Sequence, residues 1–193
     1  MDFEQRDKEG SVMIKRIVVI FITIGLSSSL TASAASSRQE GSVRNYGYTE
    51  SIRKQLAKLP YYGVFDNLGF ELNGNTVVLY GQVLRPTTRR EAERRVSKME
   101  GVDRVINRIQ VLPASSFDDS IRRRVYNAVF RTGGLQRYAM GANPSIHIVV
   151  NKGRVSLEGV VSNQMDSQLA YTAANGVSGV FSVTNNLRVG KDS

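Results

Sequence analysis

The feature that most constrains this chain is an internal repeat. The stretch GVDRVINRIQV at residues 101–111 is followed 78 positions later by GVFSVTNNLRV at residues 179–189. Glycine, valine, valine, asparagine and valine occupy the same five places in both stretches. Upstream at the same offset, TVVLYGQV (76–83) lies over RVSLEGVV (154–161) without a gap. Self-similarity at a fixed spacing indicates a structural unit that occurs more than once, so the sequence predicts two copies of one small domain.

The two copies also begin alike. ESIRKQL (50–56) resembles DSIRRRV (119–125), but here the offset is 69 positions. The second copy therefore contains nine more residues between its first helix and the matching strand. We expect these additional residues to lie around Arg131 to Asn143.

Hydrophobic spacing predicts the same order of elements in each copy, namely helix, strand, strand, helix and strand. In the first copy, apolar residues at i, i+4 and i+7 give residues 50–59 one apolar helical face. The Asn-Gly-Asn sequence at 73–75 is typical of a hairpin turn. Thr88 and Glu91 have the spacing of a capping box, which would open the second helix.

The connection between the last two strands determines the relative direction of these strands in the sheet. A strand–helix–strand crossover within one sheet is expected to be parallel and right-handed. Each copy then forms a mixed three-stranded sheet with two helices on one face, and the chain is an α+β protein of two tandem α-β-β-α-β units. The link at 112–116 is short, which favours two domains in contact.

The N-terminus has the pattern of a secretory signal peptide. Lys15 and Arg16 form a positive region, ten apolar residues follow at 17–26, and Ala32-Ser33-Ala34 fits the small-x-small rule for cleavage. The apolar run is shorter than the roughly 20 residues that a membrane-spanning helix needs. A retained anchor is therefore the weaker interpretation, and we expect no transmembrane span after cleavage.

These patterns predict the organisation of the whole chain. The predicted segments are a signal peptide at 1–34, a flexible lead-in at 35–47, a first domain at 48–112, a linker at 113–118 and a second domain at 119–190. We expect a periplasmic or secreted protein.

Composition excludes several kinds of chemistry. The chain has no cysteine, so disulfides, zinc–thiolate sites and thiol catalysis are excluded. His147 is the one histidine and has no acidic cluster near it in the sequence, so it makes no persuasive metal site. Common catalytic motifs are absent as well. The sequence predicts neither an enzyme nor a cofactor.

Charge indicates the kind of partner. There are 26 Lys and Arg residues against 17 Asp and Glu, a formal net charge of +9. An excess of this sign favours anionic partners such as lipid headgroups, nucleic acid or acidic polymers. The alternative is that a basic surface only keeps the protein soluble.

Four glycines recur at equivalent places. Gly81 and Gly159 lie at the same point of the second strand, and Gly101 and Gly179 follow the second helix of each copy. Glycine inside a strand usually marks a bulge or a close approach of backbone. We interpret all four as structural.

The second helix differs in charge between the copies. In the first copy it carries the candidate anion-binding side chains Arg89, Arg90, Arg94, Arg95 and Lys98. Arginine can bind phosphate oxygens in bidentate fashion. The alternative is a solvated face that Glu91 and Glu93 partly neutralise. In the second copy the same helix is apolar, with Leu169 and Tyr171 as candidate lipid contacts. A further basic set, Arg122, Arg123 and Arg124, lies on the first helix of that copy.

The two copies share short sequence patterns that resemble those of a known family. The phrase V-x-L-x-G-x-V, a helix with a central alanine and G-V-x-x-V-x-N-x-[IL]-x-V occur in both copies, over about residues 48–190. This pattern resembles the BON domain (bacterial osmotically inducible and nodulation). The resemblance implies an envelope protein that binds or shields phospholipid membranes, often under osmotic or other envelope stress.

Three functions remain open from the sequence. The first is docking on an anionic phospholipid membrane surface, with peripheral membrane association. The second is a protein-interaction or chaperone-like module that uses the apolar helix of the second copy against envelope proteins. The third, nucleic-acid binding, is disfavoured by export and because the strands lack aromatic pairs that stack bases.

Overall fold

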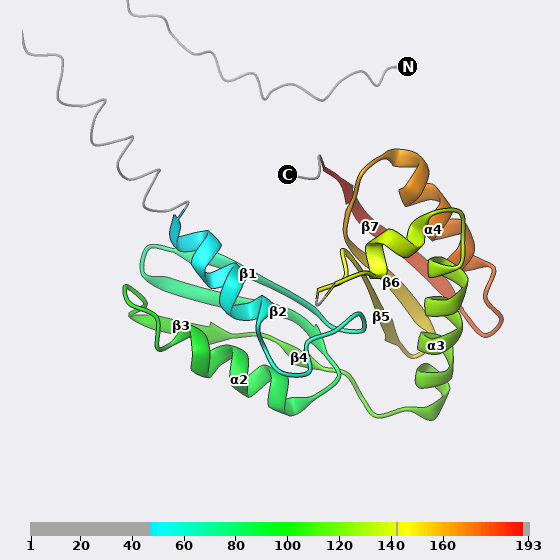
Figure 1. Cartoon of the computed structure of the whole chain (residues 1–193). Coiled ribbons are helices and arrows are strands. Elements are labelled where there is room, and N and C mark those ends of the chain that lie inside the picture. Colours follow the sequence, from blue (N-terminus) through cyan, green and yellow to red (C-terminus); the bar gives the residue numbers. More distant parts are fainter. Residues whose placement is uncertain (1–46, 142, 191–193) are drawn as a thin grey trace, which may run out of the picture. The chain divides into compact units, whose positions relative to one another are not determined.

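The structure, a computed structural model, describes residues 47–141 and 143–190. These residues belong to one compact unit, Glu40–Ser193, which holds both sequence repeats (Figure 1). The predicted signal peptide at 1–34 and all but the last residue of the predicted lead-in lie outside the described residues.

The first repeat follows the predicted order of elements. Residues 47–57 are helical. The elements after them are β1 (Asn67–Asn73), β2 (Thr76–Val83), α2 (Pro86–Val96), β3 (Arg104–Asn107) and β4 (Gln110–Val111). β1 and β2 form the predicted antiparallel hairpin, in which Asn73 pairs with Thr76. β3 and β4, both parallel to β2, are two stretches of the single last strand expected from the sequence.

The second repeat has the same plan and the same register. Its elements are α3 (Ser116–Phe130), the short 3-10 helix η1 (Leu135–Ala139), β5 (Ile146–Asn151), β6 (Arg154–Val161), α4 (Gln164–Asn175) and β7 (Ser182–Val189). β5 is antiparallel and β7 parallel to β6. Each paired residue of β2 meets the residue 28 positions later, as Thr76 meets Arg104, and β6 does likewise, as Arg154 meets Ser182.

Both helices of a repeat cover one face of its sheet. In β2 the buried residues Val77, Leu79 and Val83 alternate along the strand and so share a face. They pack with buried side chains of both helices, which are Ile52, Leu56, Ala92 and Val96. The second core repeats this arrangement with α3, α4, β5 and β6. The predicted fold class, two tandem α-β-β-α-β units with mixed sheets, is confirmed.

α2 does not begin at the predicted capping box. Pro86 is its first residue, Arg85 precedes it without a side-chain capping bond, and Thr88 is buried inside the first turn. Proline suits the first helical position because it lacks the N–H group that a helix leaves unpaired there. Glu91 pairs instead with Arg94, one turn further along.

The additional residues of the second repeat contain η1, between α3 and β5. Tyr138 Oη donates to Asp166 Oδ2 at 2.5 Å and accepts from the Ser162 N–H at 2.8 Å. Arg137 also pairs with Asp166. These bonds attach the insertion to the first turn of α4.

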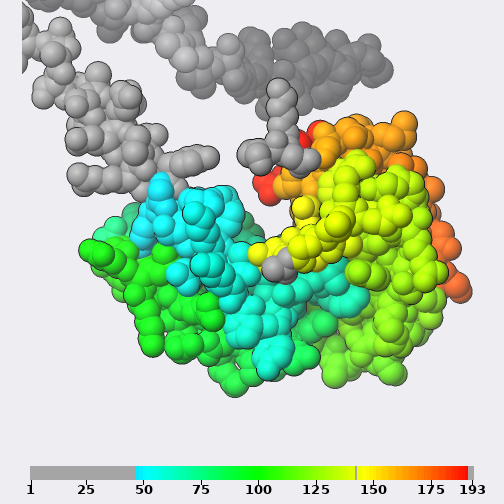
Figure 2. Space-filling model, in the orientation of Figure 1, coloured from blue at the N-terminus to red at the C-terminus, as the bar shows by residue number. Residues whose placement is uncertain are grey.

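The segment before β1 contacts the second repeat. Val64 and Phe65 pack against the second core. The Ile148 N–H donates to the Val64 carbonyl at 2.7 Å. In the space-filling view the cyan surface of the first repeat touches the yellow surface of the second (Figure 2).

Candidate functional site

Most of the cations predicted at the second helix of the first repeat are exposed. The exposed ones are Arg89, Arg90, Arg94 and Lys98, whereas Arg95 is half-buried. Arg94 pairs with Glu91 at 2.5 Å, and the hydrogen bond from Arg94 is the main reason why the pKa of Glu91 is lowered. Among the described residues, the large exposed apolar side chains include none from α2. This face therefore offers charge without a group that could insert into a membrane.

The structure corrects the prediction for Arg122. Its residue is only 2% exposed. Its Nη2 donates to the Val150 carbonyl at 2.6 Å and its Nη1 to Asp119 Oδ1 at 2.5 Å. Burial and these two bonds keep the guanidinium away from any surface. Arg123, the next residue, is exposed and stays a candidate.

The apolar helix of the second repeat is partly used in packing. Leu169 packs against the second core together with Ala173 and Val177, and it is half-buried. Tyr171 is half-buried too. Both residues keep some exposed surface and stay candidate lipid contacts.

The recurring strand glycines fit close to backbone carbonyls. Gly81 has φ 115° and Gly159 has φ 118°, conformations that favour glycine. A Cβ atom on Gly81 would lie 2.1 Å from the Asn67 oxygen, and one on Gly159 would lie 2.0 Å from the Ser145 oxygen. Gly101 (φ 82°) and Gly179 (φ 86°) follow the second helices. These residues shape the backbone.

An aromatic pair that sequence reasoning missed lies at one end of the second repeat. Phe117 is in the first turn of α3, and Phe181 directly precedes β7. Their side chains are exposed, Phe117 to 46% and Phe181 to 72%, and the ring centroids are 6.0 Å apart. Large apolar side chains that gather on a surface mark contact sites.

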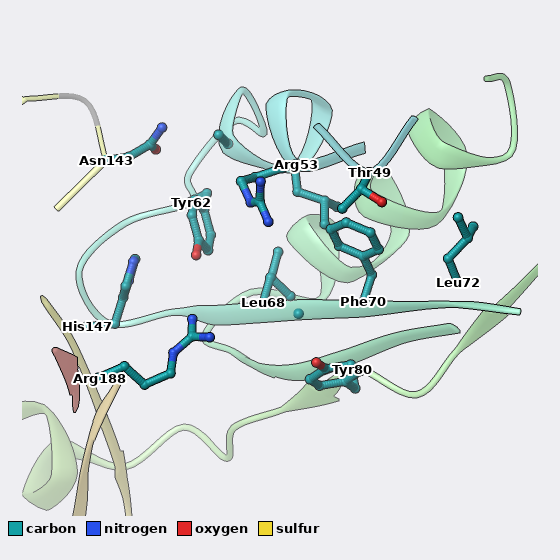
Figure 3. A pocket seen from close by; sticks show the side chains of 13 residues that line it. Thr49, Arg53, Tyr62, Leu68, Phe70, Leu72, Tyr80, Asn143, His147 and Arg188 are labelled. Carbon is teal, nitrogen blue, oxygen red and sulfur yellow. The ribbon is translucent and has the colours of Figure 1, made fainter. Parts of the chain in front are cut away.

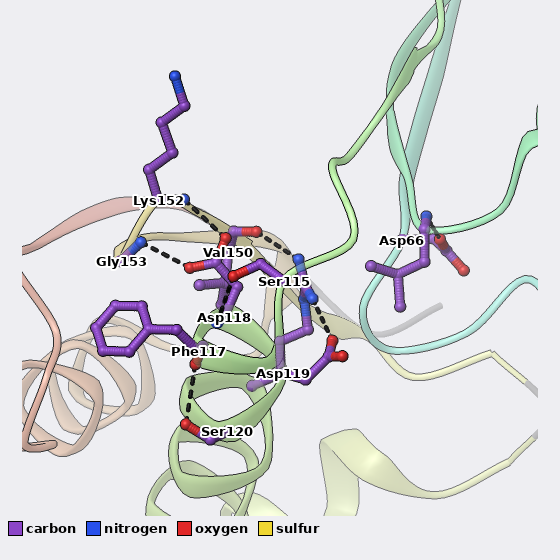
Figure 4. A network of polar contacts seen from close by, with 11 residues as sticks. Asp66, Ser115, Phe117, Asp118, Asp119, Ser120, Val150, Lys152 and Gly153 are labelled. Atoms are coloured by element: carbon purple, nitrogen blue, oxygen red, sulfur yellow. Dashed lines mark hydrogen bonds and ion pairs between the residues drawn. The ribbon is translucent and has the colours of Figure 1, made fainter.

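Asp118 fixes the backbone beside this pair (Figure 4). Its carboxylate accepts the N–H groups of Lys152 and Gly153, each at 2.8 Å, and so ties the β5–β6 turn to the start of α3. Both turn residues have positive φ, 53° at Lys152 and 73° at Gly153. A Cβ atom on Gly153 would lie 2.7 Å from the Phe181 ring. The missing side chain therefore leaves the space in which Phe181 lies.

Cations surround the aromatic pair. Lys152 and Arg154 line the same cleft as Phe181, with a volume of about 660 Å³. A Cβ atom on Gly179 would lie 3.1 Å from Arg124 Nη2 and 3.8 Å from the Phe117 ring, so both side chains lie beside this glycine. We call Phe117, Phe181, Arg124, Lys152 and Arg154 together the aromatic corner.

One signal in the sequence could have revealed this corner. Phe181 occupies the position that Asp103 has in the first copy, at the offset of 78. Phe117 likewise matches Tyr48 at the offset of 69. A phenylalanine in place of an aspartate just before the last strand breaks the pattern of a solvated loop.

His147 is buried at the contact between the repeats. Its ring lies 5.4 Å from that of Tyr62, and Nδ1 is 3.2 Å from the Gly63 carbonyl oxygen. Burial lowers the pKa of His147 more than its hydrogen bonds and Asp66 raise it, so the ring is neutral at pH 7. Burial also raises the pKa of Asp66, and it raises the pKa of Tyr62 to about 12.

The part of the chain that the structure describes has neither a candidate metal cluster nor a candidate membrane span. No group of three or more His, Asp or Glu side chains within residues 47–141 and 143–190 could hold a metal ion. In that part of the chain, no helix has both the length and the apolar character needed to cross a membrane.

Comparison with known families identifies the family of this chain. The model of the BON domain matches residues 49–113 and again residues 117–191. The chain therefore belongs to the BON domain family. This domain is non-enzymatic and occurs in periplasmic and envelope proteins, so membership supports a non-catalytic envelope protein.

Other comparisons add little. No curated protein matches the chain. A structure of CdsD, a structural protein of the type III secretion system of Chlamydia trachomatis, is similar with a TM-score of 0.30 and 9% identity, covering 74% of this chain and 93% of that one. A structure of the C-terminal domain of CdsD has a TM-score of 0.30 and 10% identity, and the match covers 70% of this chain and 96% of that one. Likeness at this level carries no argument about function.

Proposed function

We propose that this protein docks on anionic phospholipid membranes through the aromatic corner. Phe117 and Phe181 enter the headgroup region, while Arg124, Lys152 and Arg154 attract lipid phosphates. The observation that supports this most is that two exposed phenylalanine rings and three cations share one end of the second repeat. Apolar groups combined with basic residues are the usual means by which soluble domains bind a membrane surface.

The expected strength suits reversible attachment. A basic residue near an anionic surface contributes about 1 kcal/mol, and full burial of a phenylalanine side chain contributes about 1.5–3 kcal/mol. A few such groups hold a protein peripherally, without the permanence of a membrane-spanning helix. The exposed cations Arg90 and Lys98 add attraction at longer range, without inserting.

The proposal includes the location. Cleavage before Ala35 would release the mature chain into the periplasm or the medium, where it would meet anionic lipid and help to protect the envelope under osmotic or other stress. The ten-residue apolar run and Ala32-Ser33-Ala34 support this. N-terminal sequencing of the protein from an envelope fraction is expected to begin near Ala35. An intact Met1 in the membrane pellet would contradict it.

Liposome flotation tests the function directly. The mature chain is mixed with vesicles of phosphatidylcholine alone or with phosphatidylglycerol added, and the fraction that floats is measured. We expect flotation only with phosphatidylglycerol, and less of it as salt rises, because the Debye length falls from about 10 Å at 0.1 M to about 3 Å at 1 M. Equal flotation with both vesicles, or none with either, would refute the proposal.

A further inference from the structure

The second repeat has a cleft on the sheet face that its helices do not cover. In β6 the side chains of Val155 and Leu157 belong to the second core, so Arg154 and Ser156 face the opposite side. Thr184 of β7 pairs with Ser156 and shares this open face. All three residues of the open face line the cleft of about 660 Å³ beside the aromatic corner.

The charge of this cleft is positive. Lys152 and Arg154 line it, and none of the other described residues that line it is charged. Both cations are exposed, and within residues 47–141 and 143–190 neither forms an ion pair. Glu158, which lies farther along β6 outside the lining, accepts a hydrogen bond from Asn186 at 2.7 Å. Because lysine and arginine bind phosphate oxygens by charge-assisted hydrogen bonds, the two cations suit an anionic ligand.

Neutral hydrogen-bonding side chains accompany the two cations. Asn151 and Thr184 line the cleft and are exposed, and Gln82 of β2 lines it too. Amide and hydroxyl groups both donate and accept hydrogen bonds, as the hydroxyl groups of a polyol do. The volume is within the range of small-molecule sites, about 300–1,000 Å³. The cleft therefore suits a small ligand with several hydroxyl groups and a negative group.

The same face of the first repeat has different side chains. At the offset of 78, Gly74 and Thr76 stand in place of the two cations, and Ile106 stands in place of Thr184. The strand register is shared, since Val78 pairs with Ile106 as Ser156 pairs with Thr184. The fold does not require the polar and cationic lining, because the first repeat has the same strands without it.

We propose that this cleft binds a polyol that carries a phosphate group. Lys152 and Arg154 hold the phosphate oxygens, while Asn151 and Thr184 bind the hydroxyl groups. Soluble glycerol phosphate and the headgroup of phosphatidylglycerol share this chemistry. The cleft has its two cations in common with the aromatic corner, but its ligand can be soluble, so this proposal and the membrane proposal can fail separately.

Titration with soluble ligands tests the proposal without lipid. Amide chemical shifts of the mature chain are followed at constant ionic strength as glycerol 3-phosphate is added, with glycerol and inorganic sulfate as control ligands. We expect saturable shifts at Asn151, Arg154 and Thr184 with glycerol 3-phosphate at millimolar concentration. Glycerol lacks the charge and sulfate lacks the hydroxyl groups, so each should bind at least about tenfold more weakly.

Two arginine variants on the same sheet face form a matched pair. Arg154→Gln removes a hydrogen bond to a charged group and should weaken binding of glycerol 3-phosphate about tenfold. Arg188, four residues after Thr184 in β7, faces the same side but lines a different cleft, beside Tyr62 and Leu68 (Figure 3). Arg188→Gln removes the same charge and should leave binding nearly unchanged.

A third variant tests the hydroxyl contact. Thr184→Val keeps the shape of the side chain and removes its hydroxyl group, so binding of glycerol 3-phosphate should weaken about threefold, as for one neutral hydrogen bond. The weak binding of sulfate should stay the same. The three substituted residues are exposed, so circular dichroism should show an unchanged fold.

Vesicles then identify the source of the ligand. Phosphatidylglycerol and phosphatidylserine carry the same net charge, but only phosphatidylglycerol has a free glycerol group. A headgroup ligand predicts stronger flotation with phosphatidylglycerol and loss of this preference in Thr184→Val. A soluble ligand predicts equal flotation with both lipids.

Three results of the titrations would overturn the proposal. These are no saturable shifts with glycerol 3-phosphate, equally tight binding of sulfate, and equal losses in Arg154→Gln and Arg188→Gln. Shifts centred on Tyr62 and Leu68 would overturn it as well, because the ligand would then occupy the other cleft. Absence of flotation with every vesicle would refute membrane docking and leave the polyol phosphate site in place.

Discussion

The corner formed by the first helix, the hairpin turn and the loop after the second helix differs between the two repeats. In the first repeat Tyr48 lies 3.5 Å from the Cβ position of Gly101, and Asp103 accepts a hydrogen bond from Asn75 at 2.9 Å. In the second repeat Phe117 and Phe181 replace Tyr48 and Asp103. The backbone is shared, but one corner is polar and partly acidic, while the other is aromatic and basic.

The comparison shows at which positions side chains can change the function without loss of the fold. The strand glycines, the strand register and the cores agree between the repeats, because any change there costs packing. Phe117, Phe181 and Asp103 belong to neither core and are free to differ, whereas Tyr48 packs against the first core. On the proposed function, the second repeat carries the membrane contact and the first repeat does not.

The largest effect is expected when the second corner is made like the first. Phe181→Asp removes an inserting ring, worth about 1.5–3 kcal/mol when fully buried, and adds a negative charge, worth about 1 kcal/mol near an anionic surface. Binding to phosphatidylglycerol liposomes should weaken by about 50-fold or more, measured by co-sedimentation. Phe181→Leu keeps an apolar group and should lose far less. Equal losses in both variants would contradict insertion.

Charge reversal on the first repeat should have a smaller effect. The triple variant Arg90→Glu, Arg94→Glu and Lys98→Glu changes the net charge by six units. Because this face acts at longer range, where salt screens it, binding should weaken only about tenfold at 0.1 M salt. At 1 M salt the variant and the wild type should bind alike, because this face attracts but does not insert. The residues lie outside the core, so circular dichroism should be unchanged. A loss that persists at high salt would instead assign direct contact to α2.

The reverse exchange, made in the first repeat, should strengthen liposome binding modestly. Asp103→Phe in the first repeat removes an acidic group and supplies an exposed ring. The uncharged residues Gln55, Gly74 and Thr76 stand where the aromatic corner has Arg124, Lys152 and Arg154. We expect binding to liposomes with phosphatidylglycerol to rise about threefold. Asp103→Asn, which removes only the charge, is the matched control. A gain as large as the loss in Phe181→Asp would show that the ring alone decides binding.

The smallest expected effect is on stability rather than on membrane binding. It concerns His147, whose counterpart in the first repeat is Gly69. The pKa of buried His147 is lowered below its usual 6.5, so the unfolded chain binds the proton more tightly than the folded chain does. Its contribution to stability is complete above about pH 6.5 and declines as pH falls below that value. The melting temperature should therefore drop by a few degrees between pH 7.5 and 5.5, and His147→Gln should reduce this drop.

The charged groups near His147 set the useful pH range. Asp66 and Glu158 raise the pKa of His147 but less than burial lowers it. Burial raises the pKa of Asp66, which therefore acts in the opposite direction, at pH values above its usual value of 3.8. The His147→Gln variant keeps Asp66, so the difference between the variant and the wild type isolates the histidine. An unchanged pH dependence in His147→Gln would contradict this account.

The sequence predicted the repeated fold because its signals are local. Alternating strands, the hairpin turn and the paired glycines depend on neighbours a few residues away, and the structure has them where they were expected. The buried state of Arg122 could not be predicted in this way. Arg53 has a similar local sequence and a matching ion pair, yet its side chain is 64% exposed, whereas Arg122 also donates to the Val150 carbonyl of β5.

The candidate site was harder to predict for the same reason. Leu169 has the spacing of an apolar surface, but its burial depends on how α4 packs. Phe117 and Phe181 are 64 positions apart in the sequence and meet only because α3 begins beside the strand that Phe181 precedes. Contacts of this kind follow from tertiary structure, which no local pattern contains.

A single tryptophan tests the central claim most directly, since the chain has none of its own. Phe181→Trp places the reporter in the aromatic corner, and Tyr48→Trp places it in the corresponding corner of the first repeat. On addition of phosphatidylglycerol liposomes, the emission of Phe181→Trp should shift to shorter wavelength and be shielded from a soluble quencher, while that of Tyr48→Trp stays as it was. A shift in Tyr48→Trp alone, or in neither variant while the protein still binds, would contradict the account.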